Sequence, residues 1–241
     1  GALATAIAAA MLNARMGLIL TGLLALLSGV GYAGAHHAWL AALVMAVGAG
    51  LYGLSSRRGV QPYVSMGPIA LAFIVAEGIA PKPEASVWTN AAITAGLVVL
   101  SGIWGSAIGA LIGRRVSMPA LNPLPAKRAQ WYAVLMAVTL GIAMWFVSHF
   151  QWQHGGAWML LTMLIVIQPY VQDTWRKGLQ RVLGTILGFS IVMVIAELTT
   201  SELALGLFAL GFLAVAMYVQ LIAHKPYWIY ATLLTPGIVI A

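Results

Sequence analysis

The stretch that decides the fold reads QPYVQDTWRKGLQRVLGTILG and covers residues 168–188. It places three cations and one acid between two long apolar runs, in a chain that is otherwise nearly uncharged. Only 7% of the 241 residues are charged and 62% are hydrophobic, whereas soluble domains carry roughly a quarter charged residues. A water-soluble fold could not hide this much apolar surface. The sequence therefore predicts a protein that crosses a membrane several times.

Ten apolar segments follow one another along the chain, and most have the length of a membrane-spanning helix, about 17–25 residues. They cover residues 1–12, 16–33, 38–54, 62–80, 87–112, 130–149, 156–171, 177–198, 202–223 and 226–241. Backbone groups in lipid must find their hydrogen bonds within the protein, which favours helices. We therefore predict an all-α, polytopic transmembrane helix bundle. Since the chain starts at Gly1 and stops within an apolar run at Ala241, we expect that both ends are trimmed.

Lys and Arg are distributed unevenly between the loops. If the segments cross the membrane in alternation, one side receives Arg15, Arg57, Arg58, Arg114, Arg115, Lys127, Arg128, Arg176, Lys177, Arg181 and Lys225. The other side receives Lys82 and four of the five acids: Glu77, Glu84, Glu197 and Glu202. The positive-inside rule makes the cation-rich side cytoplasmic. The net charge of +7 is thus explained by topology, and no nucleic-acid partner is predicted.

A loop at residues 113–129, with three prolines and four cations, separates the predicted helices into two blocks. We predict that it is a cytoplasmic linker between an N-terminal transmembrane block, 1–112, and a second transmembrane domain, 130–241. The tetrapeptide Gln-Pro-Tyr-Val occurs at 61–64 and again at 168–171, a trace that a duplicated transporter would leave. The spacing to the preceding tryptophan differs by more than a helical turn, so a duplication stays open.

Pro169 is expected to end or kink the helix before it, because it has no amide hydrogen and restricts the preceding residue. Asp173 or Thr174 is then expected to cap the next helix. One face of that helix gathers two cations and a run of small residues: Lys177, Arg181, Gly184, Thr185 and Gly188. An Arg toward the bilayer centre costs about 2.5–3.5 kcal/mol, so Arg181 is predicted to pair with a counter-ion, Asp173 being the nearest, or to bind substrate.

The motif as a whole resembles the fusaric acid resistance family of inner-membrane proteins, also called the aromatic acid exporter family. The residues that carry the resemblance are Trp158, Leu161-Thr162, Gln168-Pro169, Arg176, Arg181, Gly184-Thr185 and Gly188, with Tyr227-Trp228 and Leu234-Thr235-Pro236 later in the chain. The resemblance covers about 130–241. It implies a multi-pass protein of the bacterial inner membrane that exports aromatic or hydrophobic carboxylic acids, driven by the proton gradient.

On this basis we expect a small organic anion as substrate, captured on the cytoplasmic side by Arg181 and Arg176. Hydrogen bonds are expected from Thr185 and Thr162, a smooth groove from Gly184 and Gly188, and apolar surface from Trp158, Tyr170 and Trp228. The candidates for proton coupling are Asp173, Glu77 and Glu197. A homo-oligomer in the lipid bilayer is expected. Two alternatives are left open: a passive organic-anion channel and a non-transporting scaffold for envelope assembly.

Nothing in the sequence indicates an enzyme or a cofactor. The motifs of P-loop nucleotide hydrolases, zinc proteases and serine hydrolases are missing from it. There is no cysteine, and the histidine pair His36-His37 has no carboxylate at ligand spacing, so no metal site is predicted. The glycines beside Trp104, at positions 102, 105, 109 and 113, are predicted to form a helix-packing face, although Trp104 itself could line a cavity for aromatic cargo.

Overall fold

The computed structural model describes residues 2–78, 84–113, 121–152, 155–199, 201–221 and 226–239. Within these ranges all regular structure is helical, and no strand occurs. The chain divides into two compact units, residues 1–167 and 168–241. Each unit has its own helix packing, so each is described by itself.

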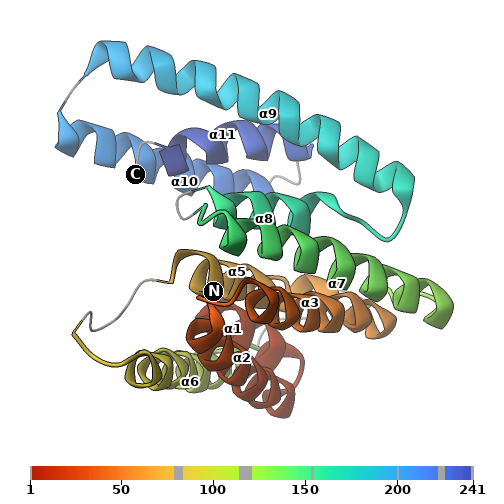
Figure 1. Ribbon diagram of the computed structural model, residues 1–241. Helices are drawn as coiled ribbons and strands as arrows, with labels where there is room; N and C mark the ends of the chain where they lie inside the picture. Colours follow the sequence, from red (N-terminus) through yellow and green to blue (C-terminus); the bar gives the residue numbers. More distant parts are fainter. Residues whose placement is uncertain are drawn as a thin grey trace. The chain divides into compact units, whose positions relative to one another are not determined.

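Unit 1 contains the first eight α-helices and one short 3-10 turn (Figure 1). They are α1 (Ala2–Leu12), α2 (Ala14–Gly34), α3 (Ala38–Ser55), the turn η1 (Ser56–Arg58), α4 (Gln61–Val64), α5 (Met66–Glu77), α6 (Val87–Gly113), α7 (Ala126–His149) and α8 (Gly156–Val166). Helices α1 and α2 pack on α6, and α3 packs on α7. The short helix α5 packs on α2, α3 and α8. The core between these helices is apolar, with Met45, Leu71, Met136 and Leu140 fully buried.

Glycines allow the closest helix contacts in unit 1. A Cβ atom on Gly105 would lie 2.6 Å from the carbonyl oxygen of Leu3, and one on Gly102 or Gly109 would overlap Thr21 or Ile7. The prediction of a packing face along α6 is confirmed at these three positions. Trp104 is 67% exposed, because it projects from the opposite side of the same helix.

Unit 2 contains α9 (Val171–Leu198), α10 (Glu202–Leu221) and α11 (Tyr227–Val239). Helix α11 packs against both α9 and α10. Gly184 of α9 lies against Ala231 of α11. One turn further along α9, Gly188 lies against Thr235, which is one turn further along α11. The two helices therefore run in the same direction, and the first turn of α11 lies beside the middle of α9, close to Gly184.

The predicted helix bundle is confirmed in part. Among the described residues, five helices are long and apolar enough to cross a membrane: Ala14–Gly34, Ala38–Arg58, Val87–Ile112, Ala126–His149 and Val171–Leu198. The other predicted segments fall on shorter helices, so ten spans are not confirmed. The segment at 62–80 is interrupted between α4 and α5, and the segment at 156–171 gives an 11-residue helix, α8, because the chain leaves the helix before Pro169.

The compact units do not coincide with the predicted blocks. The boundary lies between residues 167 and 168, not in the proline-rich loop at 113–129, because α7 packs on α3 and α8 on α5. Part of that loop, residues 114–120, lies outside the described residues. Its last part is anchored to unit 1, since the Leu124 amide donates to the Ser56 carbonyl oxygen at 2.9 Å.

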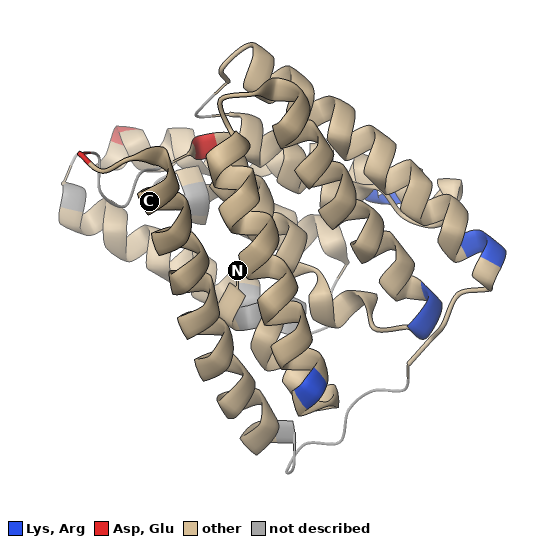
Figure 2. Cartoon of the chain, turned by 60° about the horizontal axis from the view of Figure 1, so that its bottom comes forward, with Lys and Arg blue, Asp and Glu red and all other residues tan. Residues whose placement is uncertain are grey.

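Charges of opposite sign lie at opposite ends of unit 1 (Figure 2). Arg15 lies at the start of α2, and Arg57 and Arg58 follow the end of α3. Lys127, at the start of α7, lies near Arg57 and Arg58, because Leu124 is hydrogen-bonded to Ser56. Glu77 ends α5 and lines a pocket with Tyr32, which belongs to the last turn of α2. The grouping of these loops expected from alternation therefore holds for this part of the chain.

Candidate functional site

The helix break at Gln168-Pro169 is present. Helix α8 ends at Val166, residues 167–170 are not helical, and α9 begins at Val171 after an extended Tyr170 (φ −118°, ψ 133°). The predicted cap is wrong, because Asp173 and Thr174 lie within the first turn of α9. The Thr174 hydroxyl instead reaches back across the break, where it accepts a hydrogen bond from the Gln168 amide at 2.9 Å.

The predicted stripe on α9 does share one face, and that face is covered by α11. A Cβ atom on Gly184 would lie 2.6 Å from the Ala231 Cβ and 2.8 Å from the Trp228 carbonyl oxygen. One on Gly188 would lie 2.6 Å from the Thr235 Cβ. In this structure the glycines therefore bring two helix backbones together, and α11 occupies the groove that they form.

Two buried polar atoms without hydrogen bonds lie where α9 meets the start of α11. They are the Nη1 atom of Arg181 and the hydroxyl of Tyr227. The charge of Arg181 acts on both Tyr227 and Tyr230, so the groups are neighbours. The Arg181 and Tyr227 side chains approach hydrogen-bonding distance, but Nη1 and the Tyr227 hydroxyl do not form a well-aligned bond. The Lys177 Nζ lies 5.9 Å from the centre of the Tyr227 ring. We call Lys177, Arg181, Tyr227 and Tyr230 the Arg–Tyr cluster.

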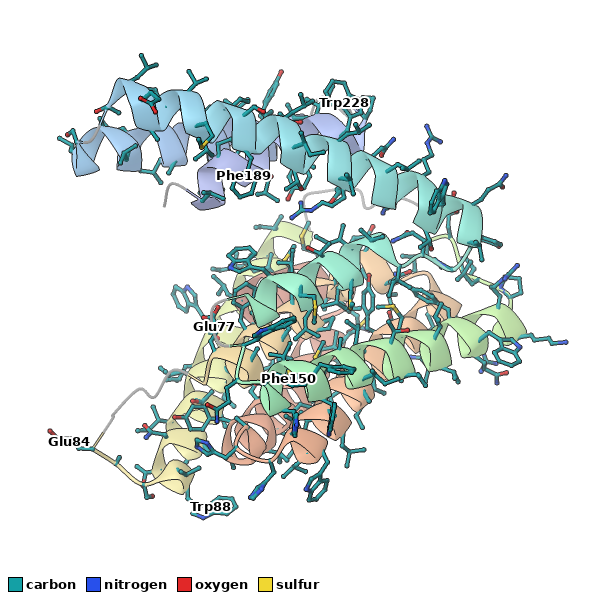
Figure 3. All side chains as sticks on the ribbon, turned by 45° about the horizontal axis from the view of Figure 1, so that its top comes forward. Glu77, Glu84, Trp88, Phe150, Phe189 and Trp228 are labelled. Atoms are coloured by element: carbon teal, nitrogen blue, oxygen red, sulfur yellow. The ribbon has the colours of Figure 1, made fainter. Side chains whose placement is uncertain are left out.

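The other predicted binding residues lie around this cluster or in unit 1. Arg176 and Tyr170 are exposed, and Thr185 is half-buried on the face that meets α11. Trp228 follows Tyr227 on α11 and is 39% exposed (Figure 3). Trp158 and Thr162 belong to α8 of unit 1, where the Trp158 ring meets Phe73 edge-on with centroids 5.1 Å apart.

The three acids proposed for proton coupling have different surroundings. Asp173 is exposed in the first turn of α9, and its charge acts on Lys177. It precedes Arg181 by eight residues, about 12 Å of helix rise. Glu197 is exposed in the last turn of α9.

Glu77 is half-buried and lines a pocket of about 170 Å³ with Tyr32, Phe73, Ile74 and Thr94. Glu84, in contrast, lies on a loop and points away from the helices of unit 1 (Figure 3). Of the three acids, Glu77 is the one that lines a pocket beside apolar side chains.

The sequence predicted Arg181 but not its aromatic neighbours. Tyr227 was noted only as part of a motif, and Tyr230 was not singled out. The signal available was their position: they lie three residues apart at the start of a helix, and therefore on one face. Which face meets Arg181 depends on the packing of α11 on α9, which no local pattern shows.

A family model described as fusaric acid resistance protein-like matches residues 142–241. This part of the chain is similar to that family. The resemblance seen in the motif is thereby confirmed over most of 130–241, including α9, the helix break and α11. No curated protein matches the chain, and no solved structure matches it.

The fusaric acid resistance family consists of transporter-like membrane proteins, not enzymes. The long apolar helices of the described residues support a multi-pass membrane protein, and the similarity over residues 142–241 supports a transporter-like one. The Arg–Tyr cluster lies entirely within the matched residues, so it is the candidate site for the activity of the family-like part.

Proposed function

We propose that the protein exports organic anions, aromatic or hydrophobic carboxylic acids in particular, from the cytoplasm. The observation that carries this proposal is the pair of buried atoms without partners, Arg181 Nη1 and the Tyr227 hydroxyl. Both are hydrogen-bond donors. A single carboxylate would satisfy both, with one oxygen accepting from Arg181 and the other from Tyr227, and Lys177 would add a second positive charge.

The energetics support a ligand at this position. A buried polar group without a partner costs about 1–3 kcal/mol, and more if it is charged. Buried polar atoms in proteins are therefore nearly always hydrogen-bonded, and each exception needs an explanation. A substrate that arrives with two acceptor oxygens removes the cost of two such atoms at once, and this favours carboxylates over neutral compounds.

Helix orientation adds to the attraction for anions. The cluster lies at the N-terminal end of α11, where Tyr227 is the first residue. A helix N-terminus carries roughly half a positive charge from its aligned peptide dipoles. The rings of Tyr230 and Trp228 supply the apolar surface for an aromatic substrate. The proposal rests on unit 2 alone, and the predicted roles of Trp158 and Thr162 stay predictions.

Proton coupling is the remaining part of the proposal. Export of an anion against its gradient needs an energy source, and a titrating carboxyl group in a membrane protein can supply it by carrying protons inward. Among Glu77, Asp173 and Glu197, we favour Glu77, since it lies in a pocket at the end of unit 1 opposite the cations. The cation-rich end is proposed to face the cytoplasm of a bacterial inner membrane.

The test is efflux of fusaric acid, a pyridine carboxylic acid, from preloaded cells that carry the full-length protein. Arg181→Ala should lower efflux efficiency about 10- to 100-fold, because a hydrogen bond to a charged group contributes about 1.5–3 kcal/mol. Arg57→Ala is the control, since Arg57 is an exposed cation that lies outside the cluster and outside the predicted binding residues. It should retain most of the activity.

Equal efflux by wild type and Arg181→Ala would refute capture by the cluster and favour a scaffold role. Flux that follows voltage and ignores a pH gradient would replace the exporter with an anion channel, while leaving the cluster as its binding site. Both outcomes are measurable in the same cells once the pH gradient and the membrane potential are collapsed separately.

A further inference from the structure

A partly buried series of hydrogen bonds in unit 1 ends at the helix break. The side-chain amide of Gln61 donates to the hydroxyl of Tyr52 at 2.9 Å and to that of Tyr132 at 3.1 Å. The Tyr132 hydroxyl in turn donates to the carbonyl oxygen of Ile167 at 3.0 Å. Tyr132 is 2% exposed, so the chain runs through the core from α3 and α4, through α7, to the residue that follows α8.

The last acceptor of these hydrogen bonds, the Ile167 carbonyl oxygen, lies at the helix break. Ile167 immediately precedes Gln168-Pro169, the break at which the chain passes from unit 1 to unit 2. On the far side of the break, the Gln168 amide is held by the Thr174 hydroxyl. Each side of the break is thus fixed by a side-chain hydroxyl, Tyr132 before it and Thr174 after it.

These hydrogen bonds also connect the first copy of the Gln-Pro-Tyr-Val tetrapeptide with the residue that precedes the second copy. Gln61 opens the first copy, and Ile167 directly precedes the second. The Tyr132 hydroxyl accepts a hydrogen bond from Gln61 and donates one to the carbonyl oxygen of Ile167. A buried hydroxyl that uses both its donor and its acceptor is costly to disturb, so this connection is a fixed feature of the core.

We propose that Tyr132 is a positioning residue for transport: it holds the end of α8 through the Ile167 carbonyl and so fixes where the Gln168-Pro169 break begins. Tyr132 belongs to unit 1 and does not belong to the Arg–Tyr cluster, so it acts on the break and not on the substrate. The effect on transport rests on the proposed function. The effect on the break does not.

The first test is hydrogen exchange, measured by mass spectrometry on the full-length protein in lipid nanodiscs. Tyr132→Phe keeps the ring and removes the hydroxyl, and it should speed exchange of the amides between residues 165 and 174 about three- to tenfold. Gln61→Leu should give a smaller increase, since the bond from Tyr132 to Ile167 remains. Tyr63→Phe is the matched control, in the same tetrapeptide as Gln61 but outside this chain, and it should leave exchange unchanged.

The second test is the kinetics of fusaric acid efflux by the same variants. Tyr132→Phe should lower the maximal rate about fivefold or more and leave KM within about twofold, because the cluster that binds the anion is intact. Unchanged exchange at 165–174 in folded Tyr132→Phe overturns the proposal. Faster exchange with normal efflux overturns the positioning role and leaves a purely structural one. If the wild type does not transport fusaric acid, the proposed function fails, and the exchange experiment still decides whether Tyr132 holds the break.

Discussion

The hydroxyl of Tyr227 is the group for which substrate binding and fold stability can be told apart by a single substitution. The Tyr227 hydroxyl is buried and makes no well-aligned hydrogen bond, so we expect it to add little to the stability of the folded protein before substrate binds. Most tyrosine hydroxyls in a protein core behave differently, as Tyr132 does with one donor and one acceptor in use. Two tyrosines in one chain thus allow the two roles to be compared directly.

Tyr227→Phe should weaken substrate binding without lowering stability. We expect KM for fusaric acid efflux to rise about tenfold, since one hydrogen bond to a carboxylate is lost. Tm should be unchanged or slightly higher, because a buried polar atom without a partner is removed. Efflux kinetics and thermal unfolding in detergent measure the two effects. A lower Tm together with an unchanged KM would mean that the hydroxyl stabilises the fold and does not touch substrate.

The contact between helices α9 and α11 depends on glycines, which have no side chain to hold the helices apart. Small residues at helix interfaces in membranes let backbones approach closely, and at Gly184 the nearest atoms of α11 include backbone atoms of Trp228 and Thr232. Backbone cannot move aside as a flexible side chain can. The helix pair therefore tolerates no added volume at this position.

Gly184→Ala should destabilise the protein by about 1–3 kcal/mol, the usual cost of overpacking. In a chain of this length that corresponds to a fall in Tm of about 2–4 °C for each kcal/mol. Gly211→Ala on α10 is the control, because no atom lies within 4 Å of its added Cβ, and replacing a helical glycine there should be neutral or stabilising. Thermal unfolding in detergent compares the two, and equal Tm values would contradict the close approach of α11.

The break and the cluster show what sequence could and could not predict. The end of α8 follows from a local fact, the missing amide hydrogen of Pro169, and the face shared by Arg181 and Gly184 follows from helical spacing. The neighbours of Arg181 do not, because Tyr227 reaches it only through the packing of α11, more than 40 residues later in the chain. The link between Tyr132 and Ile167 was missed for the same reason: the position of a helix against its neighbour is set by all their contacts together.

On the scale of the whole molecule, the charges set the orientation in the membrane. Lys and Arg lie at one end of unit 1 and Glu77 at the other (Figure 2). This arrangement satisfies the positive-inside rule only if the cation-rich end is cytoplasmic. By the same rule, the cations in the first part of α9 are expected to face the cytoplasm.

Labelling of introduced cysteines can test this orientation. Residues 1–241 contain no cysteine that would have to be removed first. Asn122→Cys, in the loop beside Gly59, should react with a membrane-impermeant maleimide only after the cells are opened. Ser86→Cys, exposed just before α6, should react in intact cells. The reverse pattern would invert the topology and make the proposed direction of transport wrong, and labelling of both in intact cells would contradict the alternation of the spans.

The chain of hydrogen bonds from Gln61 through Tyr132 to Ile167 has a consequence for how related sequences change. Gln61 and Tyr132 are 71 residues apart, yet neither can be replaced freely while the other remains. A lineage that loses the Tyr132 hydroxyl leaves the Gln61 amide with fewer acceptors in a buried site, so selection should favour a shorter or apolar residue at position 61 soon afterwards. The residues at positions 61 and 132 should therefore co-vary.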